Sequence, residues 1–269
     1  MQTKATKKPK VEEVKKPVLT GSWHGIDAWK LAGKRALSVL AVSVLYLITG
    51  MLLSFDNLIM RVLCCAAVVG LAVYYQYYQG MVLGQSDASF AEIMYAREQD
   101  GRQVTKQDRD RCFHPMKGFF AAMVGAVPFV LFAIAFAMIT KPIVYTLGVL
   151  PSWTEGMLRQ NEFGDALRYY QQGAGMSALD VMRILDRAMV MPFINVAAYL
   201  GDSQTLLVER LSPLLVLIAP LGYGCGYCQG LKLRIKINTG IKMGDDKKKR
   251  KERKARKQRQ RSSAPERLI

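Results

Sequence analysis

Histidine is scarce in this chain and cysteine is thinly spread, which limits the chemistry that its side chains can support. The 269 residues include two histidines, His24 and His114, and five cysteines, at positions 64, 65, 112, 225 and 228. A zinc site needs about four ligands, and no grouping of these residues supplies them. The cysteine spacing does not resemble the disulfide framework of a secreted protein. We therefore expect no metal site, no cofactor and no disulfide.

Motifs of nucleotide-binding and hydrolytic enzymes are missing as well. The sequence has no Walker loop, no G-x-S-x-G and no H-E-x-x-H, the patterns that mark P-loop NTPases, serine hydrolases and zinc proteases. Cys225 and Cys228 form a C-x-x-C pair, but neither a thioredoxin-like context nor a second such pair accompanies it. We expect that the chain is not an enzyme and assign it no catalytic residue.

Charge is absent from four long apolar blocks, and this absence decides the fold class. The blocks are 36–55, 62–79, 118–139 and 211–231. A helix needs about 20 apolar residues to cross the roughly 30 Å hydrocarbon core of a bilayer, so each block predicts a transmembrane helix. The predicted class is therefore an all-α, polytopic integral membrane protein with four transmembrane helices.

A fifth apolar block, 188–200, is too short to cross a bilayer. Its 13 residues make roughly 20 Å of helix at about 1.5 Å per residue. Extending the block backwards would bring in four charged residues between 180 and 187, each costing about 2.5–3.5 kcal/mol at a helix centre. We predict an interfacial or re-entrant piece at 188–200.

That piece belongs to a segment, 140–210, which we predict to be extracytoplasmic and helical. One helix is expected over 154–172, and a second is expected to start at Ser177, whose spacing to Asp180 suits a cap with an acidic first turn. In the second helix Asp180, Arg183 and Arg187 make the polar stripe.

Lysine and arginine are sorted between the two sides of the predicted spans. Of the 38 such residues, 31 lie in 1–35, 84–117 and 232–269, whereas seven lie in 56–61 and 140–210. Basic residues that flank spans stay on the cytoplasmic side. We therefore predict a multi-pass protein of a plasma membrane, of bacterial type, with both termini in the cytoplasm.

The resulting organisation alternates basic and apolar parts. A basic N-terminal segment, 1–35, precedes a transmembrane hairpin, 36–83, and a charged loop, 84–117, leads to the third span. The fourth span is followed by a basic tail, 232–269. Residues 1–20 are rich in lysine and poor in apolar residues, and the basic tail 232–269 has almost no apolar residue from Lys242 to Arg261, so we predict that both are disordered. Residues 21–35 predict either a short interfacial helix that leads into the first span or a juxtamembrane turn with aromatic anchors.

The basic tail offers a contact surface for anions. Lipid attraction contributes about 1 kcal/mol per basic residue near an anionic surface, and we favour it here together with a role of the tail in enforcing the topology. Non-specific contact with RNA or the ribosome through phosphates stays an alternative. The residues proposed for either contact are Lys247, Lys248, Lys249, Arg250, Lys251, Arg253 and Lys254.

Three glycines at intervals of four, Gly222, Gly226 and Gly230, lie in the last predicted span. They remove side chains from one helix face, so another helix can approach closely. The interface lies within the chain, between copies, or with other membrane proteins. We accordingly predict a non-enzymatic assembly or scaffold component that acts through helix packing.

A transporter or channel component for a small solute is the second hypothesis. Its polar pathway would be lined by Gln76, Gln79 and Asn195. The four spans carry no aspartate, glutamate, lysine, arginine or histidine, and such residues within a membrane are the usual mark of proton and ion pathways. This absence argues against a pump or a coupled transporter.

Overall fold

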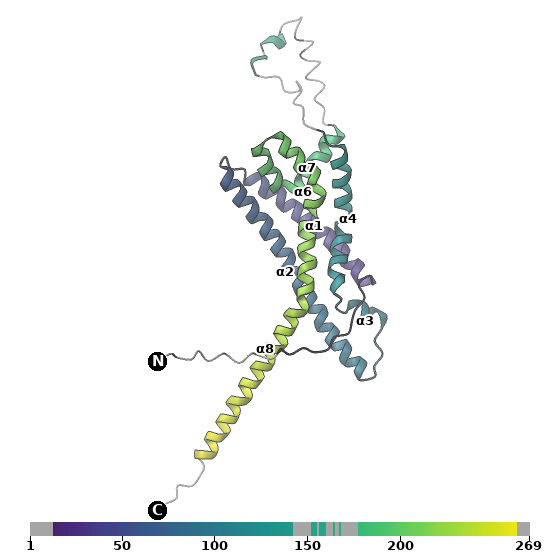
Figure 1. Cartoon of the computed structure of the whole chain (residues 1–269), viewed down its shortest axis with the longest axis vertical. Helices are drawn as coiled ribbons and strands as arrows, with labels where there is room; N and C mark the ends of the chain where they lie inside the picture. The colour runs from purple at the N-terminus through teal and green to yellow at the C-terminus, as the bar shows by residue number, and fades with distance from the viewer. Residues whose placement is uncertain are drawn as a thin grey trace, which may run out of the picture. The chain divides into compact units, whose positions relative to one another are not determined.

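The computed structural model describes residues 13–141, 152–154, 156–159, 164, 167 and 177–262 (Figure 1). In these ranges every regular element is helical. The α-helices are α1 (Ile26–Leu52), α2 (Leu58–Gln99), α3 (Lys106–Arg111), α4 (Pro115–Ile139), α6 (Ala178–Leu200), α7 (Asp202–Val216) and α8 (Ile218–Ser262), and two 3₁₀ turns cover Ser152–Thr154 and Met157–Arg159.

Four stretches of the described chain are long and apolar enough to cross a membrane. They are α1, α2, α4 and Asp202–Gln258, which contains α7 and most of α8. For the described residues, the prediction of an all-helical chain with four helices long and apolar enough to span a membrane is therefore confirmed. The expected helix 154–172 lies mostly outside the described residues.

The helices α1 and α2 extend well beyond the apolar blocks that predicted them. α1 already begins at Ile26, and α2 continues to Gln99. The first half of the predicted charged loop 84–117 is therefore helix, because extending an existing helix avoids the cost of nucleation. The chain leaves α2 through Gly101, whose φ of 75° favours glycine.

The block 188–200 is the second half of α6 and not a separate piece. α6 starts at the predicted cap, where Ser177 and Asp180 form a reciprocal capping box. Val190 has non-helical dihedrals, φ −125° and ψ 22°, and the kink lies just before Pro192, which lacks an N–H and crowds the preceding turn. The charged and apolar halves thus form one kinked helix, which ends at Gly201.

The predicted span 211–231 falls on two helices that are separated at Leu217. α7 ends at Val216 and α8 begins at Ile218, although Leu217 itself stays in the right-handed helical region with φ −73° and ψ −16°. Pro220 has no N–H to donate to the carbonyl of Val216, so one helical hydrogen bond is lost there. The interruption is therefore local.

The prediction of a disordered C-terminal tail is wrong for residues 232–262, which are helical throughout as part of α8. Lysine, arginine, glutamine, glutamate and alanine are all good helix formers, and the tail extends a helix that is already nucleated. Residues 240–258 are exposed on every side. Residues 1–12 and 263–269, the ends of the two predicted disordered tails, lie outside the described ranges.

Two compact units divide the chain. Unit 1 comprises Met1–Trp29, Tyr77–Phe119 and Gly224–Ile269, and unit 2 comprises Lys30–Gln76 and Phe120–Tyr223. The core of unit 1 is built by Ala88, Ala91 and Met94 of α2 with Cys112, Phe113 and Tyr227.

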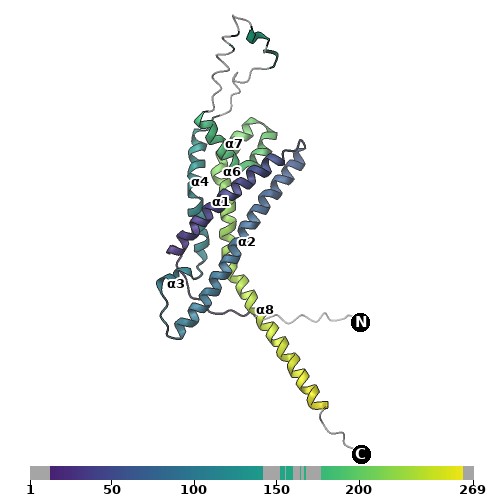
Figure 2. The same ribbon diagram turned by 180° about the vertical axis from the view of Figure 1, so that it is seen from behind.

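In unit 2, α1, α4, α6 and α7 share one core, and both views of the ribbon show α6 and α7 next to each other (Figures 1 and 2). Its buried members are Val39, Ala126, Ala133, Met189, Val190, Ile194 and Val216. A second apolar cluster of unit 2 joins Val42 and Tyr46 of α1 to Ala72 and Ala219.

Candidate functional site

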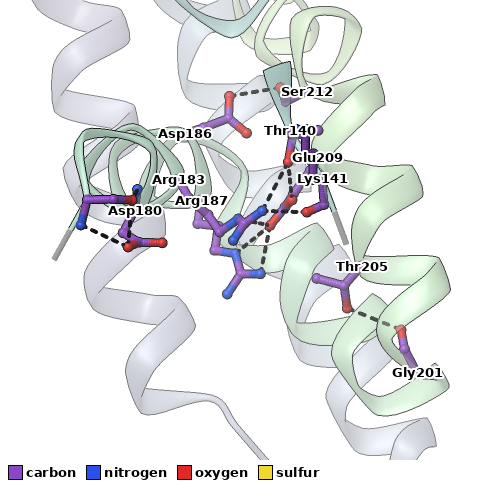
Figure 3. Close-up of polar contacts among 11 residues, drawn as sticks. Thr140, Lys141, Asp180, Arg183, Asp186, Arg187, Gly201, Thr205, Glu209 and Ser212 are labelled. Carbon is purple, nitrogen blue, oxygen red and sulfur yellow. Dashed lines mark hydrogen bonds and ion pairs between the residues drawn. The ribbon is translucent and has the colours of Figure 1, made fainter. Parts of the chain in front are cut away.

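A cluster of buried charged side chains lies in unit 2 where the end of α4 meets α6 and α7 (Figure 3). Positions 183, 186 and 187 are three and four residues apart, so they share one face of α6. We define the charged cluster as Thr140 and Lys141 after α4, Arg183, Asp186 and Arg187 on α6, and Glu209 and Ser212 on α7.

Glu209 is the centre of this charged cluster and is 1% exposed. Arg187 holds its Oε1 from two nitrogens, with Nη2 at 2.6 Å and Nε donating at 2.8 Å. The Nε of Arg183 is 3.4 Å from the same oxygen, and the hydroxyl of Thr140 donates to Oε2 at 2.9 Å. Two guanidinium groups and one hydroxyl thus surround one buried carboxylate.

Arg183 also forms hydrogen bonds between α6 and the residues that follow α4. Its Nη2 donates to the carbonyl oxygen of Lys141 at 2.7 Å and to Oγ1 of Thr140 at 3.3 Å. The residue is buried, although the sequence placed it in the polar stripe of its helix. That stripe is turned partly inward, because Glu209 supplies a buried counter-charge.

Asp186 is the second buried carboxyl group of the charged cluster and has no exposed surface. The hydroxyl of Ser212 donates to its Oδ1 at 2.8 Å, whereas Oδ2 has no hydrogen-bond partner in the described part of the chain. Burial raises the pKa of Asp186 to about 7, with the nearby charge of Glu209 acting in the same direction and the Ser212 hydrogen bond opposing both. This carboxyl group therefore titrates near neutrality.

A small pocket of about 100 Å³ adjoins the charged cluster and is lined by Lys141, Arg187, Asp202, Thr205 and Glu209 together with apolar side chains. Among the described residues, no group of three or more histidines, cysteines or carboxylates could hold a metal ion. The arrangement binds three helices together by charge and leaves one carboxyl group able to exchange a proton.

Unit 1 contains a comparable network around Lys117, which is fully buried. Its Nζ donates to Oδ2 of Asp27 at 2.9 Å, to Oδ2 of Asp87 at 3.0 Å and to the carbonyl oxygen of Arg111 at 3.3 Å. The hydroxyl of Tyr227 donates to the same oxygen of Asp87 at 2.6 Å. Lys117 of α4 thereby connects the beginning of α1 with α2 and the end of α3, and Asp87 links this network to Tyr227 of α8.

The three glycines of the last predicted span are turned toward α2 of the same chain. In unit 2, a β-carbon added at Gly222 would lie 3.0 Å from Cγ1 of Val73. In unit 1, β-carbons at Gly226 and Gly230 would collide with the backbone of α2, at the carbonyl of Tyr77 and at Gly84. This glycine face is thus occupied by a neighbouring helix of its own chain.

The three residues of the candidate polar pathway lie on helices, and two of them form hydrogen bonds to a neighbouring helix. Gln76 donates to Oγ of Ser38 at 2.6 Å, and Asn195 donates to the carbonyl of Gly50 at 2.6 Å. Gln79 lies one turn beyond Gln76 on α2. The amide groups of Gln76 and Asn195 are therefore engaged in helix–helix contacts within unit 2.

The structure also describes the surroundings of Cys112 and of the basic tail. Cys112 is buried, and burial raises the pKa of its thiol to about 11, so the reactive thiolate is rare at neutral pH. The tail residues Lys247–Lys251, Arg253 and Lys254 are exposed along α8.

Sequence reasoning missed both buried networks. After Asp202, Glu209 and its neighbour Arg210 are the charged residues of α7, and Arg183 and Arg187 have the four-residue spacing of a shared helix face. These two features were the signals in the sequence for the charged cluster.

Comparisons with known proteins add no family to this description. No family model, curated protein or solved structure matches the chain, so any functional conclusion has to be argued from the geometry itself.

Proposed function

We propose that the chain is a non-enzymatic, multi-pass membrane protein that holds an RNA-containing partner at the cytoplasmic face of the membrane. The carrying observation is that α8 continues without interruption from the last predicted span into the basic tail and ends at Ser262. The basic part of α8, residues 247–261, contains 11 lysines and arginines in 15 residues.

Distance from the bilayer argues against lipid as the partner of this basic part. Lys247 follows Leu231, the end of the predicted span, by 16 residues, or about 24 Å along a helix that rises about 1.5 Å per residue. The attraction of an anionic lipid surface falls off within a Debye length of about 8–10 Å. In its helical form most of the basic part lies beyond that range.

The basic part of α8 also lacks the apolar face by which a helix lies in a membrane interface. From Gly244 to Gln258 all side-chain positions are exposed, and Ala255 is the single apolar side chain among them. A helix that is charged all round suits a partner whose phosphates can approach from several sides. The absence of aromatic side chains predicts binding without sequence preference.

Like charges on the bare helix repel one another. Lys247 and Lys251, like Arg250 and Lys254, are four residues apart on one face, and each such pair destabilises the helix by about 0.2–0.5 kcal/mol. A polyanion relieves this repulsion. RNA binding and tail helicity should therefore rise together.

The scaffold hypothesis is retained in this proposal, but its surface is changed. Of the alternatives for the glycine face, packing within the chain is the one that its contacts with α2 support, so the face is covered there and is not open to a second copy. The exposed basic part of α8 supports partner binding better. The helix–helix hydrogen bonds of Gln76 and Asn195 favour a scaffold over a solute pathway.

The test uses the full chain in nanodiscs of zwitterionic lipid and a fluorescent, mixed-sequence, single-stranded RNA. We expect binding that weakens steeply with salt, with a log–log slope of about −0.7 for each phosphate contact. Changing the seven residues Lys247, Lys248, Lys249, Arg250, Lys251, Arg253 and Lys254 to glutamine should abolish it. The matched control changes the exposed Arg97, Arg102 and Lys106 to glutamine and should bind as the wild type does.

Two results would contradict the proposal. One is RNA binding that is equal in the seven-residue variant and its control. The other is energy transfer from a dye at position 262 to acceptor lipids in anionic nanodiscs that is absent in zwitterionic ones, because the tail would then lie on lipid. Labelling of a Ser262→Cys side chain by a membrane-impermeant reagent in intact cells would overturn the predicted topology as well.

A further inference from the structure

An apolar groove of about 600 Å³ opens in unit 2 between the first half of α2, the second half of α6 and α7. Its volume lies in the range of about 300–1,000 Å³ that holds small organic ligands. Nearly all of its lining is hydrocarbon, with Cys65 and Gln204 the polar exceptions. α6 contributes the side chains that follow its kink, beginning at Pro192 and ending at Leu200.

Gly70 forms part of the groove wall and leaves space there. A β-carbon added at Gly70 meets no atom within 4 Å, whereas one at Gly226 would collide with the backbone of a neighbouring helix. The two glycines therefore act differently: Gly226 allows close packing, and Gly70 borders an empty volume. The groove is open, and Gly70 is exposed in it, so the medium that surrounds this part of the chain has access to it.

The surroundings of the groove restrict what that occupant can be. Its α2 residues, Val62 to Gly70, belong to a candidate membrane-spanning helix, and they lie within the predicted span 62–79. The medium in contact with such a groove is lipid, in which acyl chains are the abundant solute. A chain that moves from the bilayer into the groove stays in hydrocarbon, so its affinity has to come from packing and from a contact at its headgroup.

Arg61 offers that headgroup contact, since it directly precedes Val62 of the groove. Its Nε donates to the carbonyl of Phe55 at 2.7 Å, and Nη1 donates to the carbonyl of Asn195 at 3.1 Å. The guanidinium carbon lies 5.2 Å from the ring centroid of Tyr199. The two hydrogen bonds account for two of the five guanidinium N–H groups, and the side chain is held in place with its positive charge intact.

We propose that this groove binds one acyl chain of a membrane phospholipid and that the phosphate of the same lipid pairs with Arg61. Guanidinium groups bind phosphate oxygens through strong, charge-assisted hydrogen bonds. Arg61 is the one lysine or arginine between the first two predicted spans, so the cation stands where a headgroup is expected. The inference is independent of RNA binding, because it concerns unit 2 alone.

The experiment measures lipid retention by native mass spectrometry of the full, detergent-purified chain after addition of dioleoylphosphatidylglycerol. We expect the wild type to retain one phospholipid. Gly70→Phe fills the groove and should lower retention by about tenfold or more, which corresponds to at least about 1.4 kcal/mol of binding free energy. Leu71→Phe changes the adjacent, exposed residue and should retain lipid as the wild type does.

A second pair of measurements tests the phosphate contact. Arg61→Gln should weaken retention of dioleoylphosphatidylglycerol but leave retention of dioleoylglycerol, which has no phosphate, unchanged. Thermal unfolding in detergent checks that each variant is folded. Ala66→Phe, which fills the same groove from another position on α2, replaces Gly70→Phe if that variant does not fold.

Three outcomes would overturn the inference. The first is that the wild type retains no phospholipid, and the second is that a groove-filling variant retains as much phospholipid as Leu71→Phe. The third is that the wild type proves to be a lipid-free dimer that Gly70→Phe converts to a monomer, because the groove would then hold a helix of a second copy. Equal loss of phospholipid and of diacylglycerol in Arg61→Gln would reject the phosphate contact.

Discussion

Arg187 and Glu209 form the shortest ion pair of the charged cluster, with Nη2 of the arginine 2.6 Å from Oε1 of the glutamate. Glu209 is almost entirely buried, and Arg183 draws on the same oxygen. The stability of the α6–α7 pair thus depends on one carboxylate that compensates two cations. A buried pair adds little net stability over apolar packing, but breaking it is costly because a charge is left behind.

Glu209→Gln should therefore destabilise the protein by about 3–5 kcal/mol, because two buried guanidinium groups lose their counter-charge. Unfolding by SDS in mixed detergent micelles measures this change. Glu98→Gln is the control, since the pair of Glu98 with Arg109 at 3.4 Å is exposed and such pairs contribute about 0–1 kcal/mol. Equal effects of the two substitutions would show that the charged cluster does not stabilise the fold.

Asp186 should make stability fall as pH rises. Its pKa in the folded state is raised to about 7 by burial, above the value of about 3.9 in an unfolded chain. The folded state consequently binds more protons between these values. Its extra stability is complete below about pH 4 and is lost by about pH 7, with a slope of at most about 1.4 kcal/mol per pH unit.

The pH dependence is measured by comparing wild type with Asp186→Asn, which keeps an acceptor for the Ser212 hydroxyl. Between pH 4 and pH 7 the free energy of unfolding of the wild type should fall relative to that of Asp186→Asn, and above pH 7 the difference between the two should stay constant. A difference that is flat across this range would mean that the carboxyl group stays ionised.

Lys117→Met should destabilise unit 1 by about 3–5 kcal/mol, because the buried carboxylate of Asp87 loses its cation. Adding Asp87→Asn to this variant removes the stranded charge and should recover part of the loss. The exposed Lys106 provides the control, Lys106→Met, with an expected change within about 0.5 kcal/mol. The double variant would be no more stable than Lys117→Met if the pair were unimportant, as chemical denaturation would show.

Two glycines of α8 should respond in opposite directions to alanine. Gly226→Ala forces a β-carbon against the carbonyl of Tyr77 and should cost about 1–3 kcal/mol through overpacking. Gly240 is exposed, and a β-carbon there meets nothing within 4 Å, so Gly240→Ala should stabilise the helix by up to about 1 kcal/mol. Thermal melting of the two variants decides the matter, and a tolerated Gly226→Ala would show that α2 and α8 are not in close contact.

Local sequence signals predicted local structure well. The uncharged blocks predicted four candidate spans because hydropathy over some 20 residues depends on no tertiary contact. Ser177 and Asp180 predicted the start of α6 because a capping box is completed within one turn. The kink of α6 at Val190 went unpredicted, although Pro192 was visible, because the charged half and the apolar half were treated as separate segments.

Contacts between distant residues could not be predicted in the same way. Arg183 was assigned to a polar stripe, since nothing near it in sequence indicates that Glu209 would bury with it. Lys117 is the last residue of the predicted charged loop 84–117, and nothing near it in sequence indicates that Asp27 and Asp87 enclose it. The tail was predicted to be disordered because it has almost no apolar residue from Lys242 to Arg261, but its lysines, arginines and glutamates are good helix formers.

The unbroken course of α8 beyond its predicted span has a mechanical consequence. Between Leu231 and Ser262 the helix covers 31 residues, which amounts to a lever arm of about 46 Å at about 1.5 Å per residue. If the helix stays straight, a tilt of about 10° at its base sweeps the tip through roughly 8 Å. Small changes of tilt near Leu231 would thereby be amplified into displacements the width of a protein side chain or more at the far end.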